Sequence, residues 1–425
     1  MAKIIDPIAS ITPFPWADGT FRSREEPAGG NLYSFQLNPM QHLGGYFLNP
    51  AGNATNPDGM TYAGRTRICL GTADDRIFAT AHSDGTSGTR WLAEWQIPTI
   101  VAGTDLNARN VGTRLQDYRF IETDFGELGA PEIAGLYHNP NTGALIVGYY
   151  EYYDSSGAAA FSHVHYNNGA DLATSSRVGP YNANPGDPAH FAGQIIELPP
   201  AWQAVFGGTH LVHNGIKMSI ASRSSIGPNC AVINAANPQA GVIRELMNFP
   251  YGNNWETAIG NLGGSGQPYA NDPLWNFLSD VAGACVLPGT DTLMFVGTTL
   301  DMRVPNNGTV YKGIAENSSG AFVWQDGFNP YIYQGMSPYV WLFDLNDLAR
   351  TVADPVTYPP HIHIPYWHGY WDIPGVDKRD GFQPRGAFLH RTTRQLHVSI
   401  QRGGAPRYNS GEPRFEVFNI PGVSV

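Results

Sequence analysis

The stretch Gly283–Asp301 reads GACVLPGTDTLMFVGTTLD: an apolar strand, a polar turn, and a second apolar strand that ends in polar residues. Four other segments repeat this pattern: Thr66–Gly85, Ala134–Asp154, Gly208–Ser225 and Gly386–Gly404. Repeats built from short strands indicate stacked or radial β units, so this pattern decides the fold class.

The copies share a register. In four of them, the residue that opens the second strand lies eight positions after a residue of the first: Cys69 and Ile77, Tyr137 and Leu145, Cys285 and Leu293, Phe388 and Leu396. A glycine lies two positions before that first-strand residue in three copies, at Gly135, Gly283 and Gly386. In the third copy we expect the hairpin turn at His213-Asn214-Gly215, because Asn-Gly is typical of two-residue turns.

Each copy is followed by another β-rich segment: residues 92–98, 161–167, 230–237, 340–348 and 414–421. Three to four antiparallel strands per unit is typical of a propeller blade. The sequence therefore predicts an all-β fold, a β-propeller of four-stranded antiparallel blades. Five blades are favoured by the five copies, and six or seven stay open because residues 249–337 could contain another.

We expect residues 1–60 to form an N-terminal arm that packs on the propeller of residues 61–425 and supplies a closing strand. Long inserts at 249–279 and 315–337 are rich in Gly, Asn and aromatic residues. Helical turns are predicted only at Pro199–Val205 and Asn346–Ala353, the second capped by Asp344 or Asn346.

Composition limits the partners. Charged residues make up 14% of the 425 residues, and the net charge is −11. The negative charge argues against nucleic acid and anionic membranes, and no apolar run is long enough for membrane insertion. The first residues lack the apolar core of a signal peptide. We expect an extracellular or virion-surface protein. It would reach the outside of the cell either with a signal peptide that was removed or by release on cell lysis.

The cysteines are odd in number, at Cys69, Cys230 and Cys285, and so do not form a disulfide framework. Because Cys69 and Cys285 share one repeat position, we expect them to be buried strand residues in different blades.

The second strand of each copy ends in polar residues that we expect to ring one end of the central channel. In a polysaccharide lyase, Arg223 would neutralise a uronate carboxylate while His82 and Tyr150 transfer protons. Glu151 and Arg402 would bind the ligand. Alternatively, these polar side chains only satisfy loop backbone groups and bind channel water. Glycoside hydrolysis needs two carboxylates, and Glu94, Glu132, Glu151, Asp84 and Asp154 offer no distinguished pair.

Two histidine pairs, His163/His165 and His361/His363, each lie on one strand face and could hold a metal with a third ligand. We interpret them instead as exposed sheet-face histidines. No cofactor is predicted, and a structural divalent cation is left open. The chain contains no G-x-S-x-G and no P-loop, which argues against serine hydrolase and nucleotide chemistry.

Aromatic residues are dense in the inserts, where Trp255, Trp275 and Trp324 are candidates to stack on sugar rings. The alternative is packing between blades, where aromatic side chains are common.

The segments SPYVWLFDLNDLARTV (Ser337–Val352), PYW (Pro365–Trp367) and GAFLHRTTRQLHVSIQ (Gly386–Gln401) resemble a class of bacterial and phage-type β-propeller proteins of unassigned function. The shared motifs describe blade structure, and the architecture is similar to that of propeller polysaccharide lyases. The resemblance covers about a third of the chain and transfers no catalytic motif.

The leading functional hypothesis is a binding or structural protein outside the cell that recognises a glycan or cell-surface polysaccharide, together with other particle proteins. One alternative is a secreted polysaccharide lyase or glycoside hydrolase that acts on an acidic polysaccharide. Another is a particle protein with a purely scaffolding role.

Overall fold

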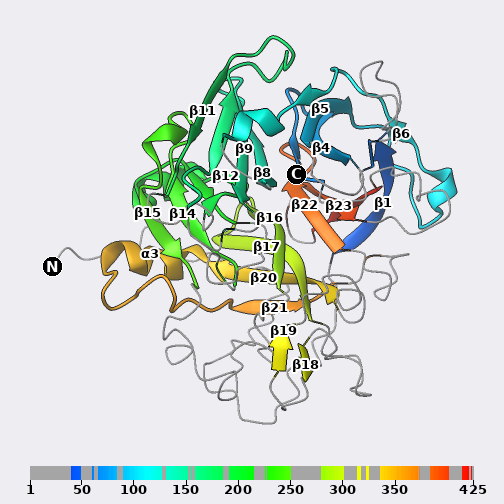
Figure 1. The fold of residues 1–425 in the computed structure, drawn as a ribbon. Coiled ribbons are helices and arrows are strands. Elements are labelled where there is room, and N and C mark those ends of the chain that lie inside the picture. Colours follow the sequence, from blue (N-terminus) through cyan, green and yellow to red (C-terminus); the bar gives the residue numbers. More distant parts are fainter. Residues whose placement is uncertain are drawn as a thin grey trace.

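The computed structural model describes residues 40–48, 60–61, 66–83, 90–126, 131–151, 154, 158–184, 191–214, 225, 227–249, 279–300, 314–316, 322–324, 336–371, 373, 383–401, 414–420 and 423. These residues form a five-bladed β-propeller, in which the sheets radiate from a central axis (Figure 1). The predicted fold class and the favoured blade number are confirmed.

We number the blades in chain order and give the strands from the axis outward. Blade 1 contains β3 (Ile68–Leu70), β4 (Arg76–Ser83), β5 (Arg90–Gln96) and β7 (Arg119–Phe120), with β2 (Met60–Thr61) also paired to β4. Blade 2 contains β8 (Pro131–His138), β9 (Leu145–Glu151), β10 (His163–Tyr166) and β11 (Arg177–Tyr181). Blade 3 contains β12 (Ile195–Glu197), β13 (His210–Val212), β14 (Cys230–Ile233) and β15 (Arg244–Met247).

Blade 4 contains β16 (Asp280–Val286), β17 (Thr292–Leu300), β20 (Met336–Asp344) and β21 (Trp367–Tyr370). Blade 5 contains β22 (Gln383–Leu389), β23 (Gln395–Gln401), β24 (Arg414–Asn419) and β1 (Gln41–Leu48), and β6 (Val111–Gly112) pairs with β1. A separate hairpin is formed by β18 (Ile314–Glu316) and β19 (Phe322–Trp324).

The ring is closed by strands from the two ends of the chain, because β1 pairs antiparallel with β24. A buried charge cluster joins these strands to the loop that precedes β6. The Glu416 carboxylate lies 2.9 Å from Arg109 Nη1 in that loop and 2.7 Å from His42 Nε2 in β1. Burial raises the pKa of Glu416, but the hydrogen bond with His42 and the charges of Arg414 and Arg109 lower it below its ordinary value. The N-terminal strand β1 therefore completes blade 5, and the edge of β24 that would otherwise be open is paired.

The repeat glycines allow the inner strands to approach one another. The inner strands β3, β8, β12, β16 and β22 contact each other in a closed ring. A Cβ atom at Gly283 would lie 2.4 Å from the Ala387 carbonyl oxygen, and one at Gly135 would lie 2.1 Å from the Gln194 nitrogen. Both glycines sit where the ladder shifts register, as Gly386 does in blade 5. The glycines seen in the sequence repeat thus mark close backbone contacts between neighbouring blades.

Five hydrophobic cores fill the spaces between the five blades of the described structure. Because successive side chains of a strand point to opposite faces of the sheet, one strand contributes side chains to two neighbouring cores. In β17, Leu293 and Phe295 pack against blade 3, whereas Met294 and Val296 pack against blade 5. Each fully buried side chain of this size contributes about 1.5–3 kcal/mol.

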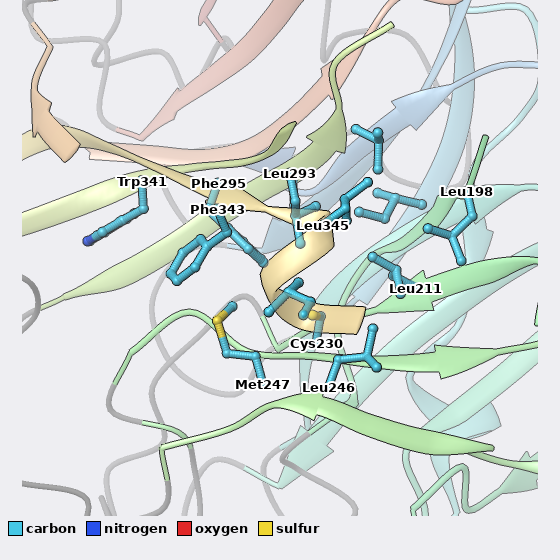
Figure 2. Packing of buried hydrophobic residues seen from close by; sticks show 14 of the residues in the cluster. Leu198, Leu211, Cys230, Leu246, Met247, Leu293, Phe295, Trp341, Phe343 and Leu345 are labelled. Atoms are coloured by element: carbon cyan, nitrogen blue, oxygen red, sulfur yellow. The ribbon is translucent and has the colours of Figure 1, made fainter. Parts of the chain in front are cut away.

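Two helices cover the core between blades 3 and 4. Helix α3 (Leu345–Ala353) inserts Leu345 into this core (Figure 2), and the Asp344 side chain caps it by accepting a hydrogen bond of 2.8 Å from the Asn346 nitrogen. Helix α1 (Pro200–Phe206) is tied to blade 4 because Trp202 Nε1 donates to Asp291 at 3.0 Å. Both predicted helices are present, and Asp344 is the cap.

The predicted strand order of the third copy is wrong, and Gly215 of its predicted turn lies outside the described residues. Strand β13 is the second strand of blade 3, and both its edges are taken by β12 and β14. The connection from the first strand is not a short turn but the segment that contains α1. The interpretation of the cysteines is confirmed: Cys69 and Cys285 are buried and free, in blades 1 and 4 respectively.

The close contact at Gly283 gives a first prediction. Gly283→Ala should lower the free energy of unfolding by at least about 2 kcal/mol, because the new methyl group meets backbone that cannot move aside cheaply. Gly103→Ala is the matched control, since no atom lies within 4 Å of a Cβ there and only the positive φ of 91° is unfavourable. Urea denaturation compares the two, and equal losses would contradict the role given to Gly283.

Candidate ligand-binding site

Two polar side chains take the place of the repeat glycine at the propeller axis. We align the inner strands on the pair that ends each first strand: Leu70↔Ile77, His138↔Leu145, Glu197↔His210, Val286↔Leu293 and Leu389↔Leu396. Three positions before the first member of each pair stand Gly135, Gly283 and Gly386, but also Arg67 and Gln194. Blades 1 and 3 therefore carry a long side chain where the other blades carry none.

Arg67 joins the inner strands of three other blades. Its Nε donates to the Ile133 carbonyl at 3.3 Å, and its Nη1 donates to the carbonyls of Ala282, at 3.5 Å, and Arg385. The side chain is 1% exposed. One guanidinium thus holds blades 2, 4 and 5 to blade 1.

Gln194 completes the set of contacts across the axis. Its Nε2 donates to the Ala387 carbonyl at 3.1 Å, and its Oε1 accepts from the Ala284 nitrogen at 3.2 Å. Blade 3 is thereby joined to blades 4 and 5. At this level the axis is filled by Arg67 and Gln194.

A cavity of about 470 Å³ lies on one side of this filled level, and all five inner strands line it. Gln194 and Ala284 belong to its lining, so we place its floor at their hydrogen bond. We call this cavity the axial pocket. Its remaining lining is mostly apolar near the strands and charged on the hairpin turns: Cys69, Leu70, Tyr137, His138, Ile195, Ile196, Glu197, Leu198, Pro199, Pro200, Cys285, Val286, Pro288, Gly289, Phe388, Leu389, Arg391 and Arg394.

Tyr137 is fixed in the wall of the axial pocket by a histidine. Its hydroxyl lies 2.7 Å from His210 Nε2, and His210 Nδ1 lies 2.7 Å from Thr209 Oγ1. Burial raises the pKa of Tyr137, and the charge of Glu197 raises it further. Burial lowers the pKa of His210 to about 4. Both groups are therefore neutral at pH 7 and act as hydrogen-bonding and packing groups.

The mouth of the axial pocket carries both signs of charge. Arg391 and Arg394 come from the turn between β22 and β23, and Glu197 ends β12. Arg391 Nη1 lies 3.9 Å from Asp74 Oδ1, with both side chains nearly half exposed. Of the two cations, Arg391 has Asp74 beside it and Arg394 has no ion-pair partner among the described residues, so the mouth suits an uncharged or anionic polar ligand better than a cation.

The ring predicted from the second strands lies at the other end of the axis, because these strands run antiparallel to the inner ones. Tyr150 is fully buried and Glu151 half-buried at the end of β9. The backbone of His82 lies in β4 and that of Trp324 in β19, but their side chains are outside the described structure. Arg223, Arg402, Trp255 and Trp275 are outside the described residues altogether. The roles assigned to this set stay predictions.

At that same end, Arg385 Nη1 pairs with Asp280 Oδ2. Glu94, one of the carboxylates considered for hydrolysis, is buried elsewhere and accepts hydrogen bonds from Thr72 Oγ1 at 2.6 Å and Gln116 Nε2 at 2.9 Å. These bonds hold the turn between β3 and β4, which is a structural role.

The expectation of exposed histidines is wrong for three of the four. His163, His165 and His363 are buried. His163 Nδ1 lies 2.8 Å from Ser162 Oγ, and His363 lies 2.8 Å from Asp347 Oδ2 and 2.6 Å from Thr351 Oγ1. Among the residues that the structure describes, no three His, Cys, Asp or Glu side chains are grouped to hold a metal ion. No helix in the described ranges is long and apolar enough to cross a membrane.

No protein family model matches the chain, and no curated protein matches it. Similar solved structures include the tail fiber of Staphylococcus aureus phage P68, at 11% identity and a TM-score of 0.39, with 90% of this chain and 53% of the fiber aligned. The chain thus spans about half the length of that fiber.

Two other similar structures are glycosidases. The catalytic domain of the Coprinopsis cinerea GH62 alpha-L-arabinofuranosidase has 10% identity and a TM-score of 0.39, with 90% of this chain and 98% of that domain aligned. The Podospora anserina alpha-L-arabinofuranosidase PaAbf62A has 10% identity and a TM-score of 0.36, with the same coverage of 90% and 98%. These scores give no specific family and carry no argument about function.

The buried histidines predict acid sensitivity. Burial lowers the pKa of four histidines to about 3 or 4: His163, His210, His213 and His397. The unfolded chain takes up protons below about pH 6.5 while the folded chain does not, so the free energy of unfolding falls by up to about 1.4 kcal/mol per pH unit per histidine. Urea denaturation between pH 7 and 4.5 measures this slope.

The variant His210→Gln measures how much one of these histidines contributes to the pH dependence of the free energy of unfolding. It removes one titrating group, so the slope of the free energy of unfolding against pH should fall by the contribution of about one proton. A wild-type stability that is constant from pH 7 to 5 would contradict the neutral, buried state of these histidines.

Proposed function

We propose that this protein is a glycan-binding β-propeller and that a sugar residue of the glycan occupies the axial pocket. The observation that carries the proposal is a cavity of about 470 Å³ that has Tyr137 and the edge of the buried Phe388 in its lining and charged groups at its mouth. This volume is in the range of small-molecule sites, about 300–1,000 Å³, which combine apolar walls with a few fixed polar groups. A sugar ring offers apolar C–H faces for the aromatic walls and hydroxyl groups for the polar mouth.

Binding accounts for the axial pocket better than glycoside hydrolysis. Hydrolysis uses a pair of carboxylates on either side of the scissile bond. Among the described residues that line the pocket, Glu197 is the only carboxylate. The neutral Tyr137–His210 pair has no charged partner within its hydrogen bonds, so it offers an ordered wall instead of an acid and a base.

The setting of this binding is part of the proposal. A charged fraction of only 14% and a net charge of −11 support a role outside the cell, on a cell-surface polysaccharide. The partner would be the glycan itself, with other proteins of a particle where the chain is displayed on one.

The test removes the aromatic wall. Tyr137→Ala should weaken binding to the preferred oligosaccharide of a glycan array about tenfold, because the ring face that packs on the sugar is lost. Titration calorimetry gives the dissociation constants, and thermal unfolding confirms that the variant is folded.

Tyr358→Ala is the matched control. Tyr358 is a half-buried tyrosine beside Arg350, outside the axial pocket, and its loss should leave binding unchanged. If Tyr137→Ala binds the glycan as tightly as the wild type, or if no glycan on the array binds, the proposal fails.

A further inference from the structure

We infer that the sugar bound in the axial pocket carries a carboxylate, held by Arg394 with Arg391 beside it. This inference rests on the proposed function and names the class of ligand. It comes from a comparison of two turns of this chain, one in blade 2 and one in blade 5.

The two turns have the same length and the same backbone hydrogen bonds. In blade 2, the Gly143 nitrogen donates to the Asn139 carbonyl at 2.8 Å, and in blade 5 the Arg394 nitrogen donates to the His390 carbonyl at 3.0 Å. Each turn is closed by a further bond of 2.8 Å, from Asn139 to Ala144 and from His390 to Gln395. Arg394 is therefore the structural equivalent of Gly143.

Arg394 adopts a backbone conformation that favours glycine. Its φ is 57°, beside 73° for Gly143, and it is the only residue other than glycine with a positive φ in the described structure. A side chain at such a φ is strained, and retained strain of this kind is found at functional sites. Because Gly143 makes the same turn without strain, the turn itself does not require an arginine.

The position of Arg394 in the lining of the axial pocket explains why an arginine is retained at this strained φ. Its side chain lines the axial pocket, and it makes no ion pair with any residue that the structure describes. A guanidinium donates two parallel hydrogen bonds to a carboxylate, a geometry that an ammonium cannot reproduce. Arg391, on the same turn, adds a second positive charge, and among the described residues its ion-pair partner is Asp74, at 3.9 Å.

The turn that carries the two arginines is held in place before any ligand arrives. His390 Nδ1 accepts hydrogen bonds from the Thr392 nitrogen at 3.2 Å and the Thr393 nitrogen at 3.1 Å. Its Nε2 donates to the Asp74 carbonyl in blade 1. A turn fixed at both ends loses little freedom on binding, which favours affinity.

Glu197 limits the charge that the mouth accepts. It lies close enough to Tyr137 to raise the pKa of that hydroxyl, while Arg391 lowers it, so both charges act on one region. With Asp74 beside Arg391, the mouth holds two arginines and two carboxylates, and Arg394 is the cation that no described carboxylate pairs. A sugar with one carboxylate matches this balance, and a multiply sulfated sugar does not.

The experiment uses an array of uronate- and sialate-bearing oligosaccharides, each printed beside its neutral methyl ester. The full chain should bind the acid member of a pair at least tenfold more tightly than the ester. Arg394→Gly should weaken binding of that acid about 10- to 100-fold, as expected for loss of a charge-assisted pair. Its thermal midpoint should equal or exceed that of the wild type, because the strain at this φ is relieved.

Two further variants separate charge from structure. Arg394→Lys keeps the charge without the planar fork and should retain part of the acid preference. Arg177→Ala, a control on the outer strand of blade 2, should change neither binding nor preference.

The outcomes distinguish the inference from the proposed function. Equal binding of acid and ester, a preference for sulfated sugars, or an Arg394→Gly variant with unchanged affinity overturns the carboxylate inference. Glycan binding that depends on Tyr137 would then still support the proposed function. Absence of glycan binding overturns both.

Discussion

The structure depends on one buried guanidinium. Arg67 donates to the backbone carbonyls of Ile133, Ala282 and Arg385, and so links its own blade to three others at the point where they converge. A guanidinium without hydrogen bonds would be costly to bury, so the charge requires that these three strands stay in place. The glycines of blades 2, 4 and 5 let the inner strands of neighbouring blades approach one another, because a Cβ atom there would meet the next blade. The close approach of the five inner strands and the filling of the axis by Arg67 and Gln194 therefore depend on the same contacts.

The filled axis also determines where a ligand can bind. Because Arg67 and Gln194 fill the centre, the end with the hairpin turns has a pocket with a floor and an open mouth instead of a channel. Each blade contributes its first strand to this pocket, and blades 3, 4 and 5 also contribute residues of the connection that follows it. The rigid strands supply Tyr137 and Phe388 to the lining and Glu197 at the end of β12, and the turn between β22 and β23 supplies Arg391 and Arg394 at the mouth. Small ligands commonly bind in such concave sites on rigid scaffolds.

The sequence predicted the blades well where the repeat was regular and less well where it was not. The spacing from Cys285 to Leu293 recurs in four blades, and the glycine two positions earlier correctly marked a structural position. Blade 3 escaped this pattern because β12 has three residues and its connection contains α1, so β13 was assigned to the wrong place in the blade. The burial of His163 and His363 depends on partners such as Ser162 and Asp347 and is not visible in an alternating pattern.

The axial pocket was beyond prediction because its walls come from five strands far apart in the sequence, with two or three residues each. Two substitutions within the repeat did carry information about it. Arg67 stands where three copies have glycine, and Arg394 stands where the turn of blade 2 has Gly143. Both departures from the repeat occur at residues of the axial region: Arg67 lies at the axis and Arg394 lines the axial pocket. The sequence instead suggested the opposite end, from the polar residues that end the second strands.

The most direct test is a crystal structure of the protein with an acidic oligosaccharide bound. The account predicts electron density for a sugar ring in the axial pocket, between Tyr137 and Phe388, with its carboxylate on the Arg394 guanidinium. A sugar bound at the opposite end of the axis, beside Asp280 and Arg385, with the axial pocket empty, would contradict it.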